Sequence, residues 1–419
     1  MPESSWLEAT SPAFRLMIAT SWLAPDSWMD RQKLAIRQAI EAGPDWTEYI
    51  RLVDRHRTPA LSWAALNRIP EFNIPEPVKT ELKKRSDACR MQAMRHSLIL
   101  VEVLKAFNRA AIPVMPLKGP ILSFDLYGDV GLRQSKDLDI AVAMEDIQRA
   151  QACLENLGWR LDSGYFPLSP RQRESFLLHE HHLGFVHPQG GCILELHWRD
   201  LSDTPSQTTA RWATSISSIW QGCSYQAMNP IDQVLYLCNH GGKHGWFRAK
   251  WLGDMARIHA MGQMDWDAAV REARKAGQEI SLLATLRLLE LVYGLPMPDL
   301  PEALRKKLPT SLIDGPLHVL QAPEEPEERT PVASFRDGLR MHRYGRLALS
   351  QRMRWETIER YGYCRGDFHV LHLPDSLFWA YAPLRPVLWF WRRVIRRGPT
   401  GESYKNDPSP ASSARHRKI

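Results

Sequence analysis

The sequence lacks paired cysteines. Its six cysteines are scattered, without a CxxC motif or any spacing typical of a disulfide framework. Zinc ribbons, thioredoxin-like redox motifs and small disulfide-rich secreted domains need such spacing, so the sequence argues against these classes. We therefore expect free thiols and a reducing compartment.

Long apolar runs are also missing. No stretch reaches the ~18 to 20 uncharged apolar residues of a membrane-spanning helix. The first residues, MPESSWLEATSPAF, have neither a basic start nor an apolar run, so no signal peptide is predicted. Together with the unpaired cysteines, these absences predict a cytoplasmic protein.

The body of the chain has little excess charge of either sign. The net charge is +7, but residues 392–419 carry eight basic and two acidic side chains, a net +6 that leaves +1 for the rest. A nucleic-acid surface is usually marked by a basic patch, so a polynucleotide partner is not expected. With 44% hydrophobic and 24% charged residues, the composition is that of a globular protein, and the length of 419 residues predicts two or three domains.

Helical and strand patterns alternate along the chain in blocks. Apolar residues recur at helical spacing near both ends, with a mixed region of strands and helices between them. An acidic, proline-rich stretch predicts a linker, and an aromatic and basic segment follows it. The predicted fold class is α/β (α+β), with a small mixed β-sheet core flanked by N- and C-terminal helical regions. The predicted parts are helical 1–108, core 109–225, helical 226–320, linker 321–333, helical and aromatic-basic 334–398, and a disordered tail 399–419.

Residues that carry chemistry gather between Val114 and Val142. Asp137 and Asp139 are two apart on a predicted strand, so their side chains project from one face while apolar neighbours face a core. Two adjacent carboxylates repel, and a hard divalent cation such as Mg²⁺ removes that cost. An Asp-x-Asp pair is common by chance, so its neighbours decide its meaning.

Those neighbours favour a phosphate ligand. Lys118-Gly119-Pro120 precedes a predicted helix, in which glycine lets the backbone approach a ligand and proline suits the first turn. The helix start would offer N–H groups to phosphate. A predicted hairpin over 180–198 carries a third carboxylate, Glu195. Three carboxylates beside a phosphate-binding helix start predict a site for metal-bound triphosphate and phosphoryl or nucleotidyl transfer.

Histidines accompany the third carboxylate. His197 shares a strand face with Glu195, and a hairpin turn at 188–191 would place His182 opposite His197. For His197, a phosphate contact, a role as base and a structural hydrogen bond all remain open.

A second histidine group lies further along the chain. His240 and His244 have a spacing that can bind zinc on a helix, but no glutamate follows His240, and Gly241-Gly242 weakens a helix there. The favoured prediction is that Lys243 and His244 reach toward the nucleotide or acceptor.

Together, these blocks resemble a bacterial family of uncharacterised nucleotidyltransferases within the DNA polymerase β-type nucleotidyltransferase superfamily. The resemblance covers most of residues 45 to 300. It depends on a combination of short blocks rather than on any single one. The blocks are His56-Arg57-Thr58-Pro59, Leu117-Lys118-Gly119, Leu126-Tyr127-Gly128-Asp129, Gly131-Leu132-Arg133, Asp137-Leu138-Asp139, Leu194-Glu195-Leu196-His197-Trp198, His240-Gly241-Gly242-Lys243-His244-Gly245-Trp246 and Lys250-Trp251-Leu252-Gly253-Asp254.

The resemblance implies a nucleotidyltransferase fold with a carboxylate triad. Asp137 and Asp139 would hold the metal ions, Mg²⁺ (or Mn²⁺), and Glu195 would complete the triad. Gly119 would lie in the loop that faces the triphosphate. An NTP, with ATP as the expected nucleotide, would then donate its NMP to a small-molecule, peptide or protein acceptor that the sequence does not name.

The sequence departs from the wider superfamily in the phosphate loop. The usual Gly-Ser pair is replaced by Lys118-Gly119-Pro120, so the serine contact to phosphate is absent. Lys118 or Arg133 is expected to substitute for it.

A rival prediction is a catalytically inactive binding module with the same fold. The missing serine favours it, and the intact set of acids opposes it. Such a module would dock a partner or a membrane surface through the segment 377–397, where aromatic residues adjoin arginines. For that segment, packing on the body is the favoured prediction, and binding to a membrane surface is the alternative.

Overall fold

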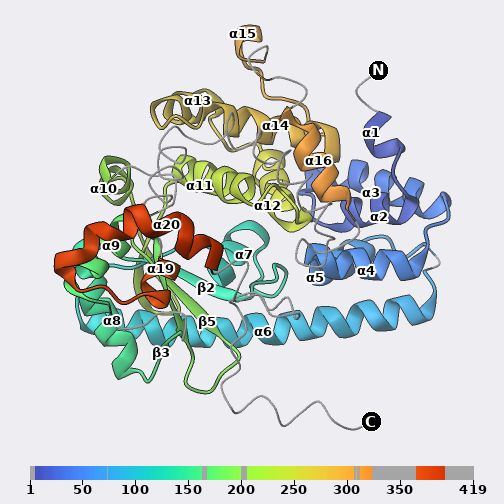
Figure 1. Ribbon diagram of the computed structural model, residues 1–419. Coiled ribbons are helices and arrows are strands. Elements are labelled where there is room, and N and C mark those ends of the chain that lie inside the picture. Colours follow the sequence, from blue (N-terminus) through green and yellow to red (C-terminus); the bar gives the residue numbers. More distant parts are fainter. Residues whose placement is uncertain are drawn as a thin grey trace.

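The computed structural model describes residues 5–72, 74–162, 168–199, 205–305, 308, 312–322 and 365–391. Within these ranges helices and strands are mixed, and a five-stranded sheet lies among helices from both ends of the chain (Figure 1). This confirms the predicted α/β class with a small mixed sheet. Nearly all of the predicted linker, part of the segment after it and the predicted disordered tail lie outside the described residues.

Helices form the N-terminal region. Two of them have side-chain caps at their N-termini. Ser11, before α2, accepts a hydrogen bond from the Phe14 N–H, and Asp45, before α4, accepts from the N–H groups of Thr47 and Glu48. The last of these helices is 34 residues long and runs beside the sheet. The helices are α1 (Ser5–Glu8), α2 (Pro12–Thr20), α3 (Asp26–Glu41), α4 (Trp46–His56), α5 (Pro59–Leu66) and α6 (Glu76–Arg109).

The central sheet has the strand order β1-β2-β5-β4-β3. β2 and β5 are parallel, and the other neighbouring pairs are antiparallel. A separate antiparallel pair, β6 and β7, was not predicted. The strands are β1 (Met115–Pro116), β2 (Asp137–Ala141), β3 (Arg160–Leu161), β4 (His182–Val186), β5 (Ile193–His197), β6 (Ile216–Trp220) and β7 (Cys223–Ala227). The helical elements between them are α7 (Gly119–Tyr127), η1 (Met144–Asp146), α8 (Ile147–Asn156), α9 (Pro170–His179) and α10 (Pro205–Ala213).

Alternation along the strands builds a core on one face of the sheet. Leu138 and Ile140 of β2 and Leu194 of β5 are almost fully buried, together with Val103 and Phe107 of α6. Because alternate residues point to opposite faces, the polar residues between them face away from this core. The sheet therefore presents a polar face opposite α6.

The hairpin formed by β4 and β5 agrees with the prediction. Its antiparallel register pairs His182 with His197, as the sequence indicated. The parallel pairing of β2 with β5, which joins the hairpin to the first half of the sheet, was not predicted.

A second group of helices packs against the N-terminal helices. Buried apolar side chains of α2, α11, α12 and α14 share one hydrophobic cluster. Asp265, the residue before α13, caps that helix by accepting a hydrogen bond from the Ala268 N–H at 2.8 Å. These helices are α11 (Pro230–Lys243), α12 (Ala249–Ala260), α13 (Trp266–Lys275), α14 (Glu279–Tyr293), α15 (Glu302–Arg305) and α16 (Asp314–Gln321).

The prediction that Gly241-Gly242 interrupts helical structure was wrong. α11 continues through both glycines to Lys243. A Cβ atom on Gly241 would lie 2.3 Å from the ring of Trp246. The glycine therefore makes room for a fully buried tryptophan, and this packing outweighs the low helix propensity of glycine.

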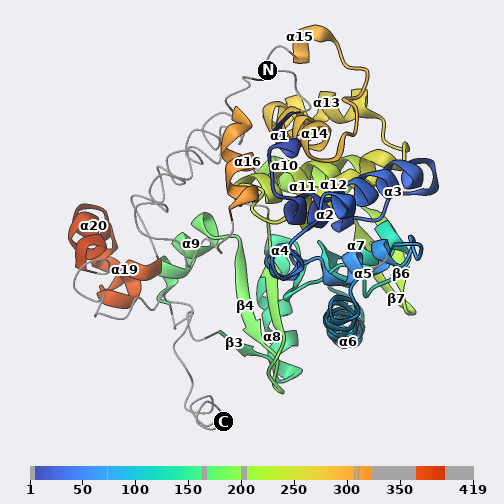
Figure 2. The ribbon, with the colours of Figure 1, turned by 90° about the vertical axis from the view of Figure 1, so that its right-hand side faces the viewer.

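The last described elements form a small unit beside α9. Tyr381 is fully buried, and its hydroxyl accepts a hydrogen bond from Gln172 Nε2 at 3.1 Å. Figure 2 shows this unit away from the N-terminal helices. Among the described helices, none has the length and apolar character needed to cross a membrane. The elements are α19 (Arg365–Val370), η3 (Asp375–Ala380) and α20 (Tyr381–Phe390).

Candidate active site

Pairing of β2 with β5 brings two acidic residues side by side. The strands are parallel, and their register places Asp139 beside Glu195. Alternation buries Leu138 and Leu194 on one side and leaves both carboxylates on the other. Asp139 is 3% exposed and Glu195 is half-buried. Two carboxylates from distant parts of the chain thus share one site.

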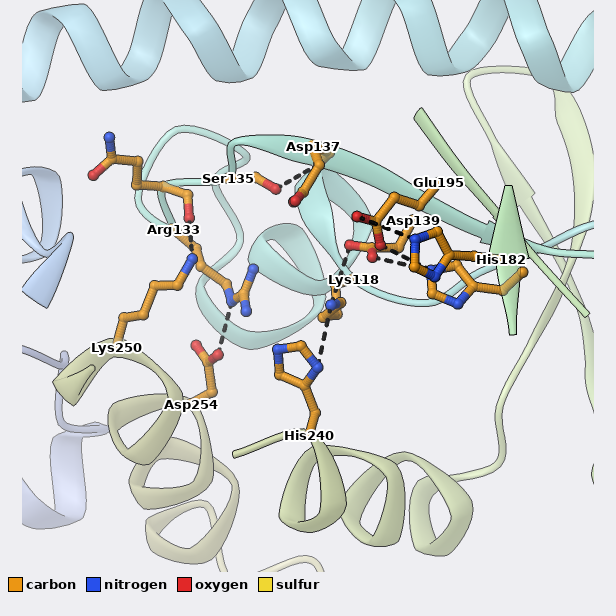
Figure 3. A network of polar contacts seen from close by, with 12 residues as sticks. Lys118, Arg133, Ser135, Asp137, Asp139, His182, Glu195, His240, Lys250 and Asp254 are labelled. Atoms are coloured by element: carbon orange, nitrogen blue, oxygen red, sulfur yellow. Dashed lines mark hydrogen bonds and ion pairs between the residues drawn. The ribbon is translucent and has the colours of Figure 1, made fainter. Parts of the chain in front are cut away.

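Two basic groups face these carboxylates. Lys118 Nζ lies 3.2 Å from Asp139 Oδ2, and His197 Nε2 lies 3.3 Å from both Asp139 Oδ1 and Glu195 Oε2. Figure 3 shows Lys118 between Asp139 and His240, whose Nδ1 is 3.4 Å from Nζ. Basic side chains therefore stand next to the carboxylates, where a bound cation would also be attracted.

These contacts shift the pKa values of all four groups. Burial opposes ionisation of Asp139 and Lys118, but Lys118 and His197 lower the pKa of Asp139, and the carboxylates raise the pKa of Lys118. Burial would also lower the pKa of His197, yet Asp139 and Glu195 produce a net rise. Burial acts to raise the pKa of Glu195, and contact with His197 lowers it overall. The site therefore favours ionised carboxylates with cationic partners.

Asp137 lies two residues before Asp139 on β2 but outside the tightest group of ligand atoms. Atoms of Asp139, Glu195 and His197 all lie within 4.8 Å of one another, and Asp137 is not part of that group. Burial and then the charge of Asp139 raise the pKa of Asp137. Its backbone oxygen accepts a hydrogen bond from Ser135 Oγ at 2.7 Å, which holds the start of β2.

His182 lies on the strand next to Glu195. Its Nε2 is 3.9 Å from Glu195 Oε1. Burial, and then the neighbouring charge of His197, lower the pKa of His182 to about 4. This imidazole is therefore neutral at pH 7.

The start of α7 requires glycine. Gly119 has a φ of +73°, a conformation that side chains rarely adopt, whereas an added Cβ would make only an ordinary contact of 3.8 Å with Leu138. Backbone conformation rather than space therefore demands this residue. The first N–H groups of a helix have no partner within it, so α7 begins beside Lys118 with donors that suit an anion.

Arg133 has a different partner from the one expected. It is 2% exposed, and its Nε donates to Asp254 Oδ2 on α12 at 2.8 Å. Its backbone N–H donates to Ser123 Oγ at 3.1 Å, and Lys250 Nζ donates to the oxygen of the adjacent Gln134 at 2.9 Å. These contacts tie the loop before β2 to α12. They give Arg133 a positioning role, and its expected contact with phosphate stays a prediction.

The end of α11 faces the site. His240 is buried next to Lys118, while His244 is exposed and stacks on Trp251 with ring centroids 5.1 Å apart. Burial, and then the charges of Lys118 and Lys243, lower the pKa of His240. The ring of His244 lies 4.9 Å from that of His240, and the charge of Lys243 acts on His182 and His240, so Lys243 and His244 lie beside histidines that border the site. Their contact with a nucleotide or acceptor stays a prediction.

Two residues at or near the site, His181 and Asp254, were not predicted from the sequence. His181 places a ring nitrogen within 4.8 Å of ring nitrogens of His182 and His197, and the adjacent pair His181-His182 was the available signal. Asp254 is fully buried and pairs with Arg133. Its position in a charged and aromatic block was noted, but no pattern along the chain linked it to Arg133.

The donor set fits a hard divalent cation. Asp139 and Glu195 supply carboxylate oxygens at one site, and Asp137 lies on the same strand. Asp139 Oδ2 is buried, and its partner is the ammonium group of Lys118 in an ion pair without hydrogen-bond alignment. Mg²⁺ and Mn²⁺ bind such oxygens. The ammonium group of Lys118 therefore places beside Asp139 the positive charge that a bound metal ion would also place there.

Comparison with known proteins shows the family of this chain. Searches of curated proteins and of solved structures returned no match. A family model described as uncharacterised nucleotidyltransferase matches residues 42–294, which include the sheet, the carboxylates and the helices that face them. The matched part is more than half of the chain, and the chain accordingly belongs to the uncharacterised nucleotidyltransferase family.

Proposed function

We propose that this protein is a magnesium-dependent nucleotidyltransferase that moves an NMP from an NTP to a hydroxyl-type acceptor and releases pyrophosphate. The observation that carries the proposal is the register of β2 and β5, which sets Asp139 beside Glu195 on a polar sheet face. The adjoining start of α7 and the ammonium group of Lys118 supply binding groups for phosphate. ATP is the expected nucleotide.

The carboxylates have distinct roles in this proposal. Asp137, Asp139 and Glu195 would hold Mg²⁺. When bound, the ion would neutralise phosphate charge and favour in-line displacement at the α-phosphorus. Glu195, the more exposed of the paired carboxylates, accepts the proton of the acceptor hydroxyl. The acceptor oxygen forms a bond to the α-phosphorus as the bond to the bridging oxygen breaks, and pyrophosphate leaves.

Basic residues around the carboxylates position the triphosphate. Lys118 stands between the start of α7 and Asp139, so a small movement of its long side chain would carry the ammonium group from the carboxylate to a phosphate oxygen. Lys243 and His244, at the end of α11, would contact the nucleotide or the acceptor. Arg133 and Asp254 hold the loop before β2 in place through their buried ion pair.

The test is calorimetric binding of the four NTPs with and without Mg²⁺. We expect binding of at least one NTP that depends on Mg²⁺ and is lost in Asp137→Asn. Asp137 suits this test because it is half-buried and lies outside the tight ion-pair cluster. Loss of a carboxylate ligand should reduce turnover by about 10³-fold or more.

A matched control is available on α7. Asp125→Asn removes a carboxylate from an exposed position of the same core and should bind nucleotide like the wild type. Equal binding by Asp137→Asn and the wild type would contradict the proposed metal site. Absence of binding of any NTP to a well-folded wild type, with and without candidate acceptors, would favour the inactive binding module instead.

A further inference from the structure

A group of three histidines adjoins the carboxylates. His181, His182 and His197 each offer a ring nitrogen, and these three atoms all lie within 4.8 Å of one another. The ring centroids of His181 and His182 are 4.5 Å apart, and that of His197 lies 5.6 Å and 5.1 Å from them. We propose that these imidazoles bind a transition-metal ion such as Zn²⁺, in a site chemically different from the proposed magnesium site.

The hairpin explains why the three rings meet. The register of β4 and β5 sets His182 opposite His197. The backbone N–H of Trp198 donates to His181 O at 3.2 Å. The pairing of the two strands therefore extends by one residue, to the position before β4 and the position after β5. Because His181 lies just before the first residue of β4, it is free of strict strand alternation, and its ring packs edge-on against that of His182.

The donor chemistry favours a borderline metal over magnesium. Mg²⁺ prefers oxygen ligands, whereas imidazole nitrogen suits Zn²⁺, Co²⁺ and related ions. A water molecule can take the fourth position beside three histidines, as in catalytic zinc sites, which leaves Glu195 to the proposed magnesium site; its Oε1 lies 3.9 Å from His182 Nε2. Donors of a tetrahedral zinc ion stand roughly 3.3–3.6 Å apart for bonds of about 2.0–2.2 Å. Small side-chain adjustments would therefore close the site.

The three histidines differ in burial, which bears on how a metal ion would bind. His197 is buried, while His181 and His182 are half-buried. An ion can thus reach the site from solvent and meet one immobile ligand, His197, which binds as the neutral imidazole and releases its proton to solvent. The other histidine pair, His240 and His244, does not form such a group of three with any other ligand among the described residues.

Co²⁺ is the spectroscopic probe for this site. The untagged full chain is treated with EDTA, titrated with Co²⁺ and followed by visible absorption, and Zn²⁺ binding is measured by calorimetry. We expect a single ion per chain with the strong absorption of four- or five-coordinate cobalt. Zn²⁺ should displace the cobalt, and a tenfold excess of Mg²⁺ should not, roughly as the order of divalent-metal affinities predicts.

Variants separate the histidine site from the carboxylate site. The double change His181→Ala and His182→Ala should weaken Co²⁺ binding by about tenfold or more. His182→Gln, which keeps most of the side-chain volume, should weaken it in the same direction if the double variant folds poorly. His318→Ala, at an exposed position of α16, is the matched control and should bind Co²⁺ like the wild type.

The outcomes also separate this proposal from the proposed function. Asp137→Asn should lose Mg²⁺-dependent nucleotide binding yet keep the cobalt spectrum, because Asp137 is not part of the histidine group. Undiminished Co²⁺ binding by a folded double-histidine variant, an octahedral spectrum, or ready displacement by Mg²⁺ would assign the ion to the carboxylates and overturn the proposal.

Discussion

At the residue scale, the two aspartates of β2 have different environments. Asp139 is 3% exposed and forms ion pairs with Lys118 and His197. Asp137 is half-buried and lies outside that cluster. The Asp-x-Asp pattern alone predicts equal roles for them, because it contains nothing about their partners. The structure therefore predicts that the two substitutions differ in their effect on stability.

Asp139→Asn should lower the free energy of unfolding of the metal-free chain by about 3–5 kcal/mol, because it removes the ion-pair partner of the buried Lys118 ammonium group, whereas His197 keeps Glu195 as a partner. Asp137→Asn should change the free energy of unfolding by less than about 1 kcal/mol. Urea denaturation followed by circular dichroism measures both.

A second substitution checks the physical cause of that difference. Adding Lys118→Met to Asp139→Asn removes one unpaired cation, so it should restore part of the lost stability. Equal stability of the two asparagine variants, or no recovery in the double variant, would show that the ion pair with Lys118 contributes little.

At the scale of elements, η3 and α20 present an apolar surface to solvent. Trp379 is 65% exposed, Val387 64%, Phe390 50% and Trp389 47%. Buried Tyr381 holds the unit together from the other side. In the sequence, four arginines follow within residues 392–397. Exposed aromatic residues next to basic ones are typical of surfaces that bind anionic lipid headgroups.

We propose that this surface contacts an anionic membrane, and sedimentation with vesicles tests it. The full chain should sediment with vesicles rich in anionic lipid and much less with neutral ones. Changing Trp379 and Trp389 to Ser should weaken this binding by about tenfold or more, given the apolar area removed.

The matched control changes exposed apolar residues elsewhere. Met91→Ser and Leu98→Ser alter side chains of α6 that are 72% and 73% exposed. They should leave vesicle binding unchanged if the surface of η3 and α20 is responsible. Equal sedimentation of both double variants, or none by the wild type, would argue against membrane contact.

At the scale of the whole molecule, several histidines are held neutral in the folded chain. Burial is the largest cause of a lowered pKa at each of them. His56 is fully buried between helices, where its Nδ1 accepts a hydrogen bond from the Ala249 N–H at 3.0 Å. The histidines are His56, His96, His182, His187, His240 and His259.

These histidines predict loss of stability in acid. Their pKa values are lowered by folding, so the unfolded chain binds more protons below about pH 6.5. The stability that depends on their neutral forms is present above that pH and is lost as the pH falls toward the folded pKa values. His197, whose pKa is raised, acts in the opposite direction. The urea midpoint should therefore fall between about pH 7 and pH 5.

One substitution isolates the contribution of a single histidine to the pH dependence of the free energy of unfolding. His56→Gln keeps a hydrogen-bond acceptor without a titrating group, so it should reduce the slope below pH 6.5 by about 1.4 kcal/mol per pH unit. A flat profile in the wild type would show that these histidines stay uncharged in both states.

Much of the local structure follows from the sequence because its causes are local. Alternation predicts the strand that carries Asp137, and the turn residues 188–191 predict the hairpin register that pairs His182 with His197. The helix of residues 147–156 ends before Gly158, whose φ is +83°. Capping, alternation and turn chemistry act over a few residues, so the order of residues already contains them.

Tertiary contacts decided the rest. The parallel pairing of β2 with β5 sets Asp139 beside Glu195, although the residues lie far apart in the chain. Asp254 takes Arg133 into a buried ion pair, and the packing of Trp246 keeps α11 helical through Gly241. Long-range contacts depend on which surfaces bury each other, and that choice is made by the whole fold rather than by local spacing. The sequence alone determined which chemical groups this protein carries, and the tertiary structure decided which of them meet.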